Sequence, residues 1–338
     1  MKYRSVGNSG VRVSEIALGS WLTFGKSLDD EIAAEIIETA YNNGINFFDT
    51  SDNYAGRKAE KLLGEALSRF PRHKLFVASK VFFPVGEGPN DKGLSRKHIF
   101  EEVKASLAAL NMDYLDLYQC HRYDYSTPLE ETVRAMSDLV RNGTILYWGV
   151  SMWSGTQVKR ACKIADRING YRPISNQVMY NFLDRQIEFN GIQKVCRKLG
   201  VGLLAFSPLA EGILTGKYQN NIPDNSRAAN KKINNFIKQR LTEKNLTESA
   251  RIVESAEKLE TTPAKLSLAW LLNRKNVSSV ITGVSHATQL LENIDATNID
   301  VPKLYLKSLE NSPFKKLYLS TYYKSLRLYR YLKYEFSS

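Results

Sequence analysis

Short apolar runs of strand length recur along this chain, and most are hydrophobic at nearly every position instead of at alternate positions. Continuous runs of Val, Ile, Leu and Phe are typical of strands buried on both faces of a parallel sheet. The pattern predicts eight strands, at residues 15–19, 45–49, 75–81, 114–120, 145–150, 175–179, 202–206 and 277–283.

Segments of helical period separate successive strands, and several follow Ser, Thr, Asp or Pro, which favour helix N-termini. They include residues 30–42, 59–69, 95–110, 129–141 and 185–199. This alternation predicts an α/β fold, a single (β/α)8 TIM barrel over residues 1–300. A doubly wound sheet is disfavoured, because the first strand runs into Gly19-Ser20-Trp21 without a glycine-rich fingerprint.

Residues 2–18 alternate between apolar and polar around Gly7-Asn8-Ser9-Gly10. Gly and Asn tolerate the positive φ of tight turns, so this segment predicts a β-hairpin ahead of the barrel. We expect the hairpin to cover one end of the barrel.

Two stretches exceed the usual length of a connection, residues 210–240 and the tail after Pro302. The formal net charge is +12, and residues 301–338 supply eight Lys or Arg against two Glu. We expect this basic, Tyr-rich C-terminal extension to form a solvated helical tail, and leave open that it docks on a channel or a membrane surface. We do not predict a nucleic-acid partner.

The start of the chain carries Lys2, Arg4 and Arg12 with no apolar core of a signal peptide, and no apolar run is long enough to span a membrane. Cys120, Cys162 and Cys196 are odd in number and widely spaced. This spacing fits neither a disulfide framework nor a zinc site. We therefore expect a cytoplasmic protein with reduced thiols.

Polar residues that could do chemistry follow several predicted strands. Asp49 ends the second strand, Tyr54 lies in the loop behind it, Lys80 ends the third strand, and His121 follows the fourth. In a barrel of this kind the carboxyl ends of the strands form one catalytic face. An ammonium paired with a carboxylate stabilises a phenolate, so we expect Lys80 and Asp49 to lower the pKa of Tyr54. The three residues predict a proton-donating relay. His121 would bind the substrate oxygen, and no metal is required.

With these residues the chain resembles the aldo-keto reductases. The resemblance rests on Asn46-Phe47-Phe48-Asp49-Thr50-Ser51 with Tyr54-Ala55-Gly56, on Ala78-Ser79-Lys80 and on His121. Further matching phrases are Tyr147-Trp148-Gly149-Val150-Ser151 and Ser207-Pro208-Leu209, and the similarity runs from Tyr3 to about Asn298. Within the family, the chain looks most similar to the potassium-channel β-subunit branch and its bacterial reductase relatives.

The resemblance implies an oxidoreductase acting on CH-OH groups, with hydride transfer from NADPH to a small carbonyl substrate and Tyr54 as proton donor. It also implies a set of cofactor contacts. Ser151 and Gln177 would hold the nicotinamide carboxamide, Phe206 would stack on its ring, and Trp21 would wall the adjoining pocket. The phosphates would lie on Ser207, Leu209, Lys217 and Arg227, and the adenosine end on Gly283, Ser285, Gln289, Glu292 and Asn293.

Two positions depart from the pattern of many relatives. Met152 stands where Asn or Arg follows the serine, and Gln289 replaces an arginine near the 2′-phosphate. We still expect NADPH rather than NADH, because Lys217, Arg227 and Ser285 are present.

The alternative from another class is a regulatory subunit that binds NADPH, docks on a potassium channel and turns over little. Channel β-subunits usually carry Asn at the position of His121, whereas the reductases carry His, which favours an enzyme. The resemblance also implies a homo-oligomer, a tetramer or larger.

Overall fold

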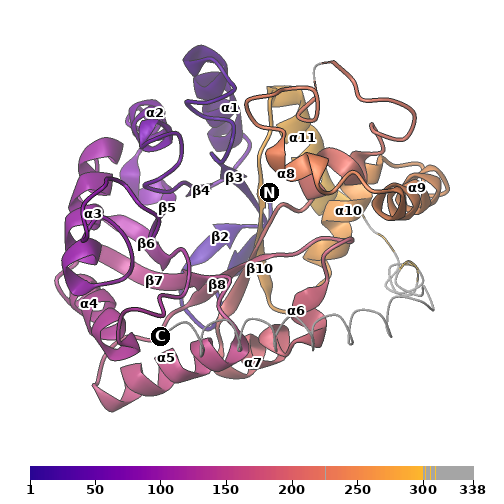
Figure 1. Ribbon diagram of the computed structural model, residues 1–338. Coiled ribbons are helices and arrows are strands. Elements are labelled where there is room, and N and C mark those ends of the chain that lie inside the picture. The colour runs from indigo at the N-terminus through magenta and orange to yellow at the C-terminus, as the bar shows by residue number, and fades with distance from the viewer. Residues whose placement is uncertain (225, 300, 302–304, 306–308, 310–338) are drawn as a thin grey trace.

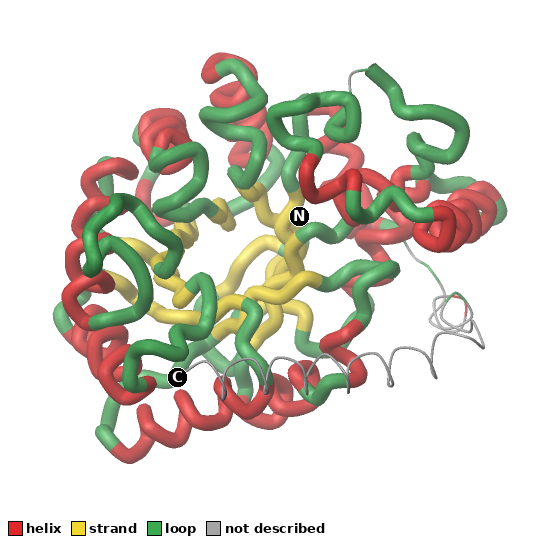
Figure 2. The backbone as a smooth tube through the Cα atoms, in the orientation of Figure 1, coloured by secondary structure: helices red, strands yellow, loops and turns green. Residues whose placement is uncertain are grey.

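The computed structural model describes residues 1–224, 226–299, 301, 305 and 309. Eight parallel strands close into a barrel in the order β10-β3-β4-β5-β6-β7-β8-β9, and helices surround it (Figures 1 and 2). The predicted (β/α)8 barrel is confirmed. Its strands are β3 Ile16–Gly19, β4 Phe47–Asp49, β5 Phe76–Val81, β6 Leu115–Cys120, β7 Ile145–Ser151, β8 Ser175–Met179, β9 Gly202–Phe206 and β10 Val277–Thr282.

The helices around the barrel pack their apolar faces against the outer side of the strands. The main helices are α1 Asp30–Asn42, α2 Lys58–Leu67, α3 Arg96–Leu110, α4 Leu129–Arg141, α5 Gly155–Arg167, α7 Ile192–Leu199, α9 Glu243–Glu257, α10 Pro263–Leu272 and α11 Ala287–Asp295. Short helical turns are η1 Arg72–Lys74, α6 Gln186–Phe189, η2 Ala210–Thr215, α8 Asn235–Lys238 and η3 Ala296–Asn298.

The helix predicted over residues 185–199 is wrong as a single element. It divides into α6 and α7, because Gly191 adopts φ +86° and so cannot continue a right-handed helix. The apolar period carries on across the break, which is why the sequence pattern does not reveal it.

The N-terminal hairpin closes the amino end of the barrel, as predicted. Its strands are β1 Tyr3–Ser5 and β2 Arg12–Ser14, which pair antiparallel. Val6 and Val13 pack into the barrel interior against Phe47, Leu117 and other inward side chains. A Cβ atom on Gly7 would lie 2.2 Å from the carbonyl oxygen of Gly200, so only glycine fits where the hairpin turn touches the barrel.

The alternation of side chains along each strand decides which residues face the open end of the barrel. Residues two apart on a strand share a face. Phe47 on β4 and Leu117 on β6 belong to the interior layer, so Asp49 and Gln119 project inward one layer further along. Lys80 on β5 lies beside Gln119 in the strand register. Charged and amide side chains therefore fill the carboxyl end of an otherwise apolar interior.

The long segment after β9 borders this open end, where Phe236 contacts Trp21. It contains η2 and α8, and Arg240 anchors its far end through ion pairs with Asp184 and Glu211. Among the described residues no helix combines the length and apolar character that crossing a bilayer demands. The predicted C-terminal extension lies outside the described residues, apart from three isolated positions.

Candidate active site

Lys80 lies at the centre of the polar cluster at the carboxyl end of the barrel. Its side chain is fully buried, and Nζ donates hydrogen bonds to Asp49 Oδ2 at 2.6 Å and to the carbonyl oxygen of Thr50 at 2.7 Å. Nζ also lies 3.2 Å from the hydroxyl oxygen of Tyr54. Burial by itself lowers the pKa of Lys80, but the charge of Asp49 and the hydrogen bonds with Asp49 and Tyr54 outweigh it, so the net pKa is raised. The ammonium therefore stays charged at neutral pH.

Two amides complete the shell of Asp49. Gln177 donates to Asp49 Oδ1 at 2.8 Å, and Gln119 donates to the same oxygen at 3.4 Å. Buried charges persist when they are paired and hydrogen-bonded, and Asp49 meets both conditions. Gln119 did not stand out in the sequence, although its place two residues after Leu117 on an inward face could have revealed it.

Tyr54 reaches the cluster from the turn between β4 and α2. The backbone takes positive φ at Ala55, Gly56 and Arg57 in succession, which directs the chain sharply back toward α2. The predicted lowering of the Tyr54 pKa by Lys80 exists, but burial is the larger influence and the net pKa is raised. The phenol therefore carries its proton at neutral pH, which is the form a proton donor needs.

His121 stands beside Tyr54, with their ring centroids 5.9 Å apart, and Phe83 packs edge-on against it at 4.8 Å. Burial holds the pKa of His121 well below its usual value, and the charges of Lys80 and Arg122 lower it further. The imidazole is neutral at pH 7. A neutral imidazole can form hydrogen bonds but carries no positive charge.

A hollow of about 210 Å³ opens beside Tyr54. Trp21 and Phe236 form one wall, with ring centroids 5.1 Å apart in an edge-to-face arrangement. Phe236 comes from α8 in the long segment after β9, and sequence reasoning missed it. A single aromatic residue in a polar loop does not indicate which part of the fold its side chain will contact.

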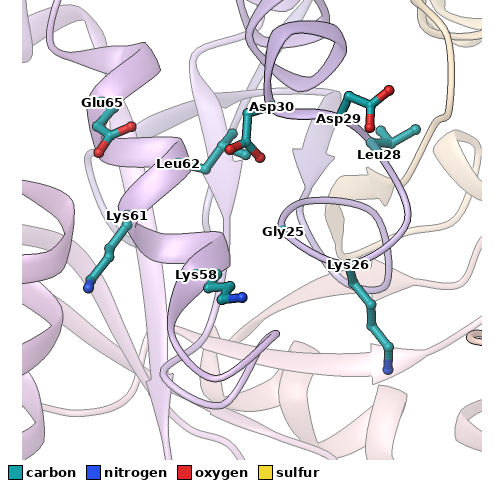
Figure 3. A pocket seen from close by; sticks show the side chains of 9 residues that line it. All are labelled: Gly25, Lys26, Leu28, Asp29, Asp30, Lys58, Lys61, Leu62 and Glu65. Carbon is teal, nitrogen blue, oxygen red and sulfur yellow. The ribbon is translucent and has the colours of Figure 1, made fainter.

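A larger hollow of about 480 Å³ lies away from this cluster, between α2 and the segment that leads into α1 (Figure 3). Its rim carries Lys58, Lys61 and Glu65 on α2, and Asp29 and Asp30 opposite (Figure 3). It contains none of the predicted catalytic or cofactor-binding residues. We therefore place the candidate active site at the smaller hollow.

The residues predicted to hold the nicotinamide lie at the ends of three adjacent strands. Ser151 on β7 is paired with Gln177 on β8, and Met179 on β8 is paired with Phe206 on β9. Ser151 and Gln177 are buried, whereas the Phe206 side chain is partly exposed. Met152 takes φ +59°, and its amide donates to the carbonyl oxygen of Gln177 at 2.8 Å.

The predicted phosphate contacts gather on the segment after β9. Ser207 donates its hydroxyl hydrogen to Glu211 at 2.9 Å, and Leu209 directly precedes η2. Partial burial and the neighbouring charge of Arg227 both lower the pKa of Lys217, and burial also lowers that of Arg227. These two cations repel one another, and an anion between them would relieve that repulsion.

The predicted adenosine contacts surround the turn from β10 into α11. Gly283 is exposed, while the side-chain oxygen Oε1 of Gln289 accepts hydrogen bonds from both the backbone amide and the hydroxyl of Ser285. Glu292 is partly exposed, but Asn293 is buried on the inner side of the helix. The role of each of these residues in binding remains a prediction.

A buried acidic cluster behind His121 was also missed by sequence reasoning. Asp52 and Glu60 are at most 1% exposed, and Glu102 lies next to them. Arg57 bridges Glu60 and Glu102 by ion pairs, and Ser79 donates to Glu60 at 2.6 Å. The three acidic residues come from the loop after β4, from α2 and from α3, so no local sequence spacing predicts the cluster.

Comparison with known proteins agrees with this geometry. The sequence model described as "Aldo/keto reductase family" matches residues 15–311. The chain is 41% identical over 302 residues to a protein of Arabidopsis thaliana named "Probable voltage-gated potassium channel subunit beta", which covers 88% of this chain and 92% of that protein. A protein of Oryza sativa subsp. japonica with the same name is 40% identical over 302 residues, with the same coverage.

Proposed function

This chain belongs to the aldo/keto reductase family, and on that premise we propose that it reduces aldehydes or ketones to alcohols with NADPH, using Tyr54 as the proton donor. The observation that carries the proposal is the contact of one buried ammonium, Lys80 Nζ, with both Asp49 and Tyr54. That arrangement lies beside the hollow lined by Trp21 and Phe236.

The chemistry of the mouth supports a dinucleotide. Lys217 and Arg227 offer adjacent cations for phosphate, together with Ser207 and Leu209. Phe206 presents a partly exposed aromatic ring at the end of β9. We assign the nicotinamide amide to Ser151 and Gln177. The adenosine end is assigned to Gly283, Ser285, Gln289, Glu292 and Asn293. When bound, NADPH supplies a hydride for the carbonyl carbon.

The protein's own residues then bind and protonate the carbonyl oxygen of the substrate. His121 is neutral, so it can donate an uncharged hydrogen bond that orients the carbonyl and stabilises the negative charge that develops on it. Tyr54 gives its proton to that oxygen and becomes a phenolate. Lys80 lies 3.2 Å away and stabilises the phenolate as it forms, while Asp49 keeps the ammonium oriented.

The test is NADPH oxidation at 340 nm with a panel of small aldehydes and ketones. Tyr54→Phe should lower kcat by about 100-fold or more, the range that a positioned general acid contributes. NADPH binding, followed by quenching of protein fluorescence, should remain. Tyr41→Phe is the matched control, because Tyr41 stacks on Phe70 at the outer surface of the barrel. Equal turnover in Tyr54→Phe and wild type would refute the proton-donor role.

A second candidate function follows from the names of the relatives, both of which are called potassium channel β-subunits. In this function the chain binds NADPH, associates with a channel and turns over little. A homo-oligomer, and docking through the basic C-terminal extension, belong to the same prediction. Wild-type protein that binds NADPH but reduces no carbonyl in the panel would favour this candidate.

A further inference from the structure

A short hydrogen-bonded path leads from His121 into the buried acidic cluster. Ser51 Oγ lies 3.1 Å from Nδ1 of His121 and 2.8 Å from Oδ1 of Asp52. Asn53 Oδ1 also lies within reach of Ser51 Oγ, at 2.9 Å. Three possible acceptors therefore surround a single hydroxyl hydrogen. The Ser51 hydroxyl can donate to one of them at a time, and the other two must then donate to Ser51 or leave the contact unbonded.

Asp52 sits at the far end of this path in an environment that disfavours its charge. It is 1% exposed, and its Oδ2 atom is buried without a hydrogen-bond partner in the described part of the chain. Burial is the main reason that the pKa of Asp52 rises to about 7, and the carboxylates of Glu60 on α2 and Glu102 on α3 raise it further.

The other groups that face Asp52 do not cancel this effect. Hydrogen bonds from Ser51 and from the Asn53 amide lower the pKa of Asp52, but by less than burial raises it. Arg57 also faces Asp52, and ion pairs hold its guanidinium to Glu60 and Glu102. Tyr118 on β6 is the remaining titratable neighbour, and burial raises its own pKa well above the usual value, so it stays neutral.

We propose that Asp52 is a positioning residue which, through Ser51, determines which ring nitrogen of His121 carries the hydrogen. The inference rests on the proposed reductase function, because it concerns the nitrogen that His121 turns toward the substrate. Asp52 itself touches neither substrate nor cofactor in this scheme.

The two protonation states of Asp52 have opposite consequences. A carboxylic acid at Asp52 donates to Ser51 Oγ, so the Ser51 hydroxyl is free to donate to Nδ1 of His121, and the ring hydrogen lies on Nε2. An ionised Asp52 is the strongest acceptor near Ser51 and takes its hydrogen. His121 must then place its own hydrogen on Nδ1 to bond Ser51, and Nε2 can no longer donate to a carbonyl oxygen.

The first test is the pH profile of kcat. Wild type should lose at least about tenfold in kcat between pH 6 and pH 9, with a midpoint near 7, as Asp52 ionises. Asp52→Asn removes the group that ionises, so its kcat should be nearly the same at both pH values. Asp29→Asn, which removes an exposed charge at the larger hollow, should keep the wild-type profile.

The second test observes the tautomer directly by 15N NMR of the ring nitrogens. The chain contains four His residues, and His121→Asn identifies the signals of His121. In wild type the hydrogen should move from Nε2 to Nδ1 as pH rises from 6 to 9. In Asp52→Asn the hydrogen should stay on one ring nitrogen throughout this pH range, and in Ser51→Ala the transition near pH 7 should vanish.

The two readouts separate this inference from the proposed function. If the protein reduces aldehydes but the ring hydrogen of His121 does not move with pH and is unaffected by Asp52→Asn, only the role of Asp52 is overturned. A tautomer that follows Asp52, in a protein that reduces no carbonyl at any pH, supports the coupling and refutes the reductase. A pH profile of kcat that is unchanged in Asp52→Asn also overturns the inference.

Discussion

Replacing Lys80 with Met tests the central ion pair of the site. Met has a similar length and fills the same buried space, so the change removes the charge with little change in packing. Asp49 would keep its bonds from Gln177 and Gln119 but would lose its only cation within the described hydrogen bonds and ion pairs. Removing one partner of a buried pair costs about 3 to 5 kcal/mol, so we expect a loss of this size in the free energy of unfolding.

The assay is urea unfolding at pH 7, followed by circular dichroism, for Lys80→Met, Asp49→Asn and the double variant. In the double variant neither charge is left alone, so it should be more stable than Lys80→Met by about 2 kcal/mol. Arg141→Met on α4 is a control, because its pair with Asp138 is exposed and worth under about 1 kcal/mol. A double variant that loses the sum of the two single losses would refute our account of the pair.

Two further predictions concern the pocket wall and the helix packing. Phe236→Ala removes the ring that packs on Trp21, so KM for aldehydes should rise about threefold to tenfold, the worth of one aromatic contact, with kcat little changed in steady-state assays. A fall in kcat with KM constant would contradict this. Gly64→Ala should destabilise the protein by about 1 to 3 kcal/mol in urea unfolding despite a better helix propensity, because the new Cβ would lie 2.3 Å from the carbonyl oxygen of Leu110. Gly10→Ala, with no heavy atom within 4 Å of its Cβ, should be nearly neutral, and an equal loss there would refute the packing argument.

The pattern of apolar runs was enough to predict the barrel, the strands that carry Asp49 and Lys80, and the strand that His121 directly follows. Burial on both faces imposes a continuous apolar signal, and helix caps such as Ser95 mark the connections. The amino-terminal hairpin was predictable for the same kind of local reason, since Gly7 to Gly10 encode a tight turn. The break at Gly191 was not, because the apolar period continues through it.

The sequence by itself therefore determined the fold, the family and which side chains end the strands, because those properties are written in local periodicity and in short motifs. Only the tertiary structure decided which of those side chains form hydrogen bonds or ion pairs with one another, and which of them are charged at neutral pH. Burial turned the expected lowering of the Tyr54 pKa into a rise and made His121 neutral. The fold also brings Ser51 within hydrogen-bond distance of His121, which lies seventy positions later in the chain, and Ser51 links His121 to Asp52. Desolvation and hydrogen bonding depend on distances across the barrel, and the order of residues along the chain does not contain those distances.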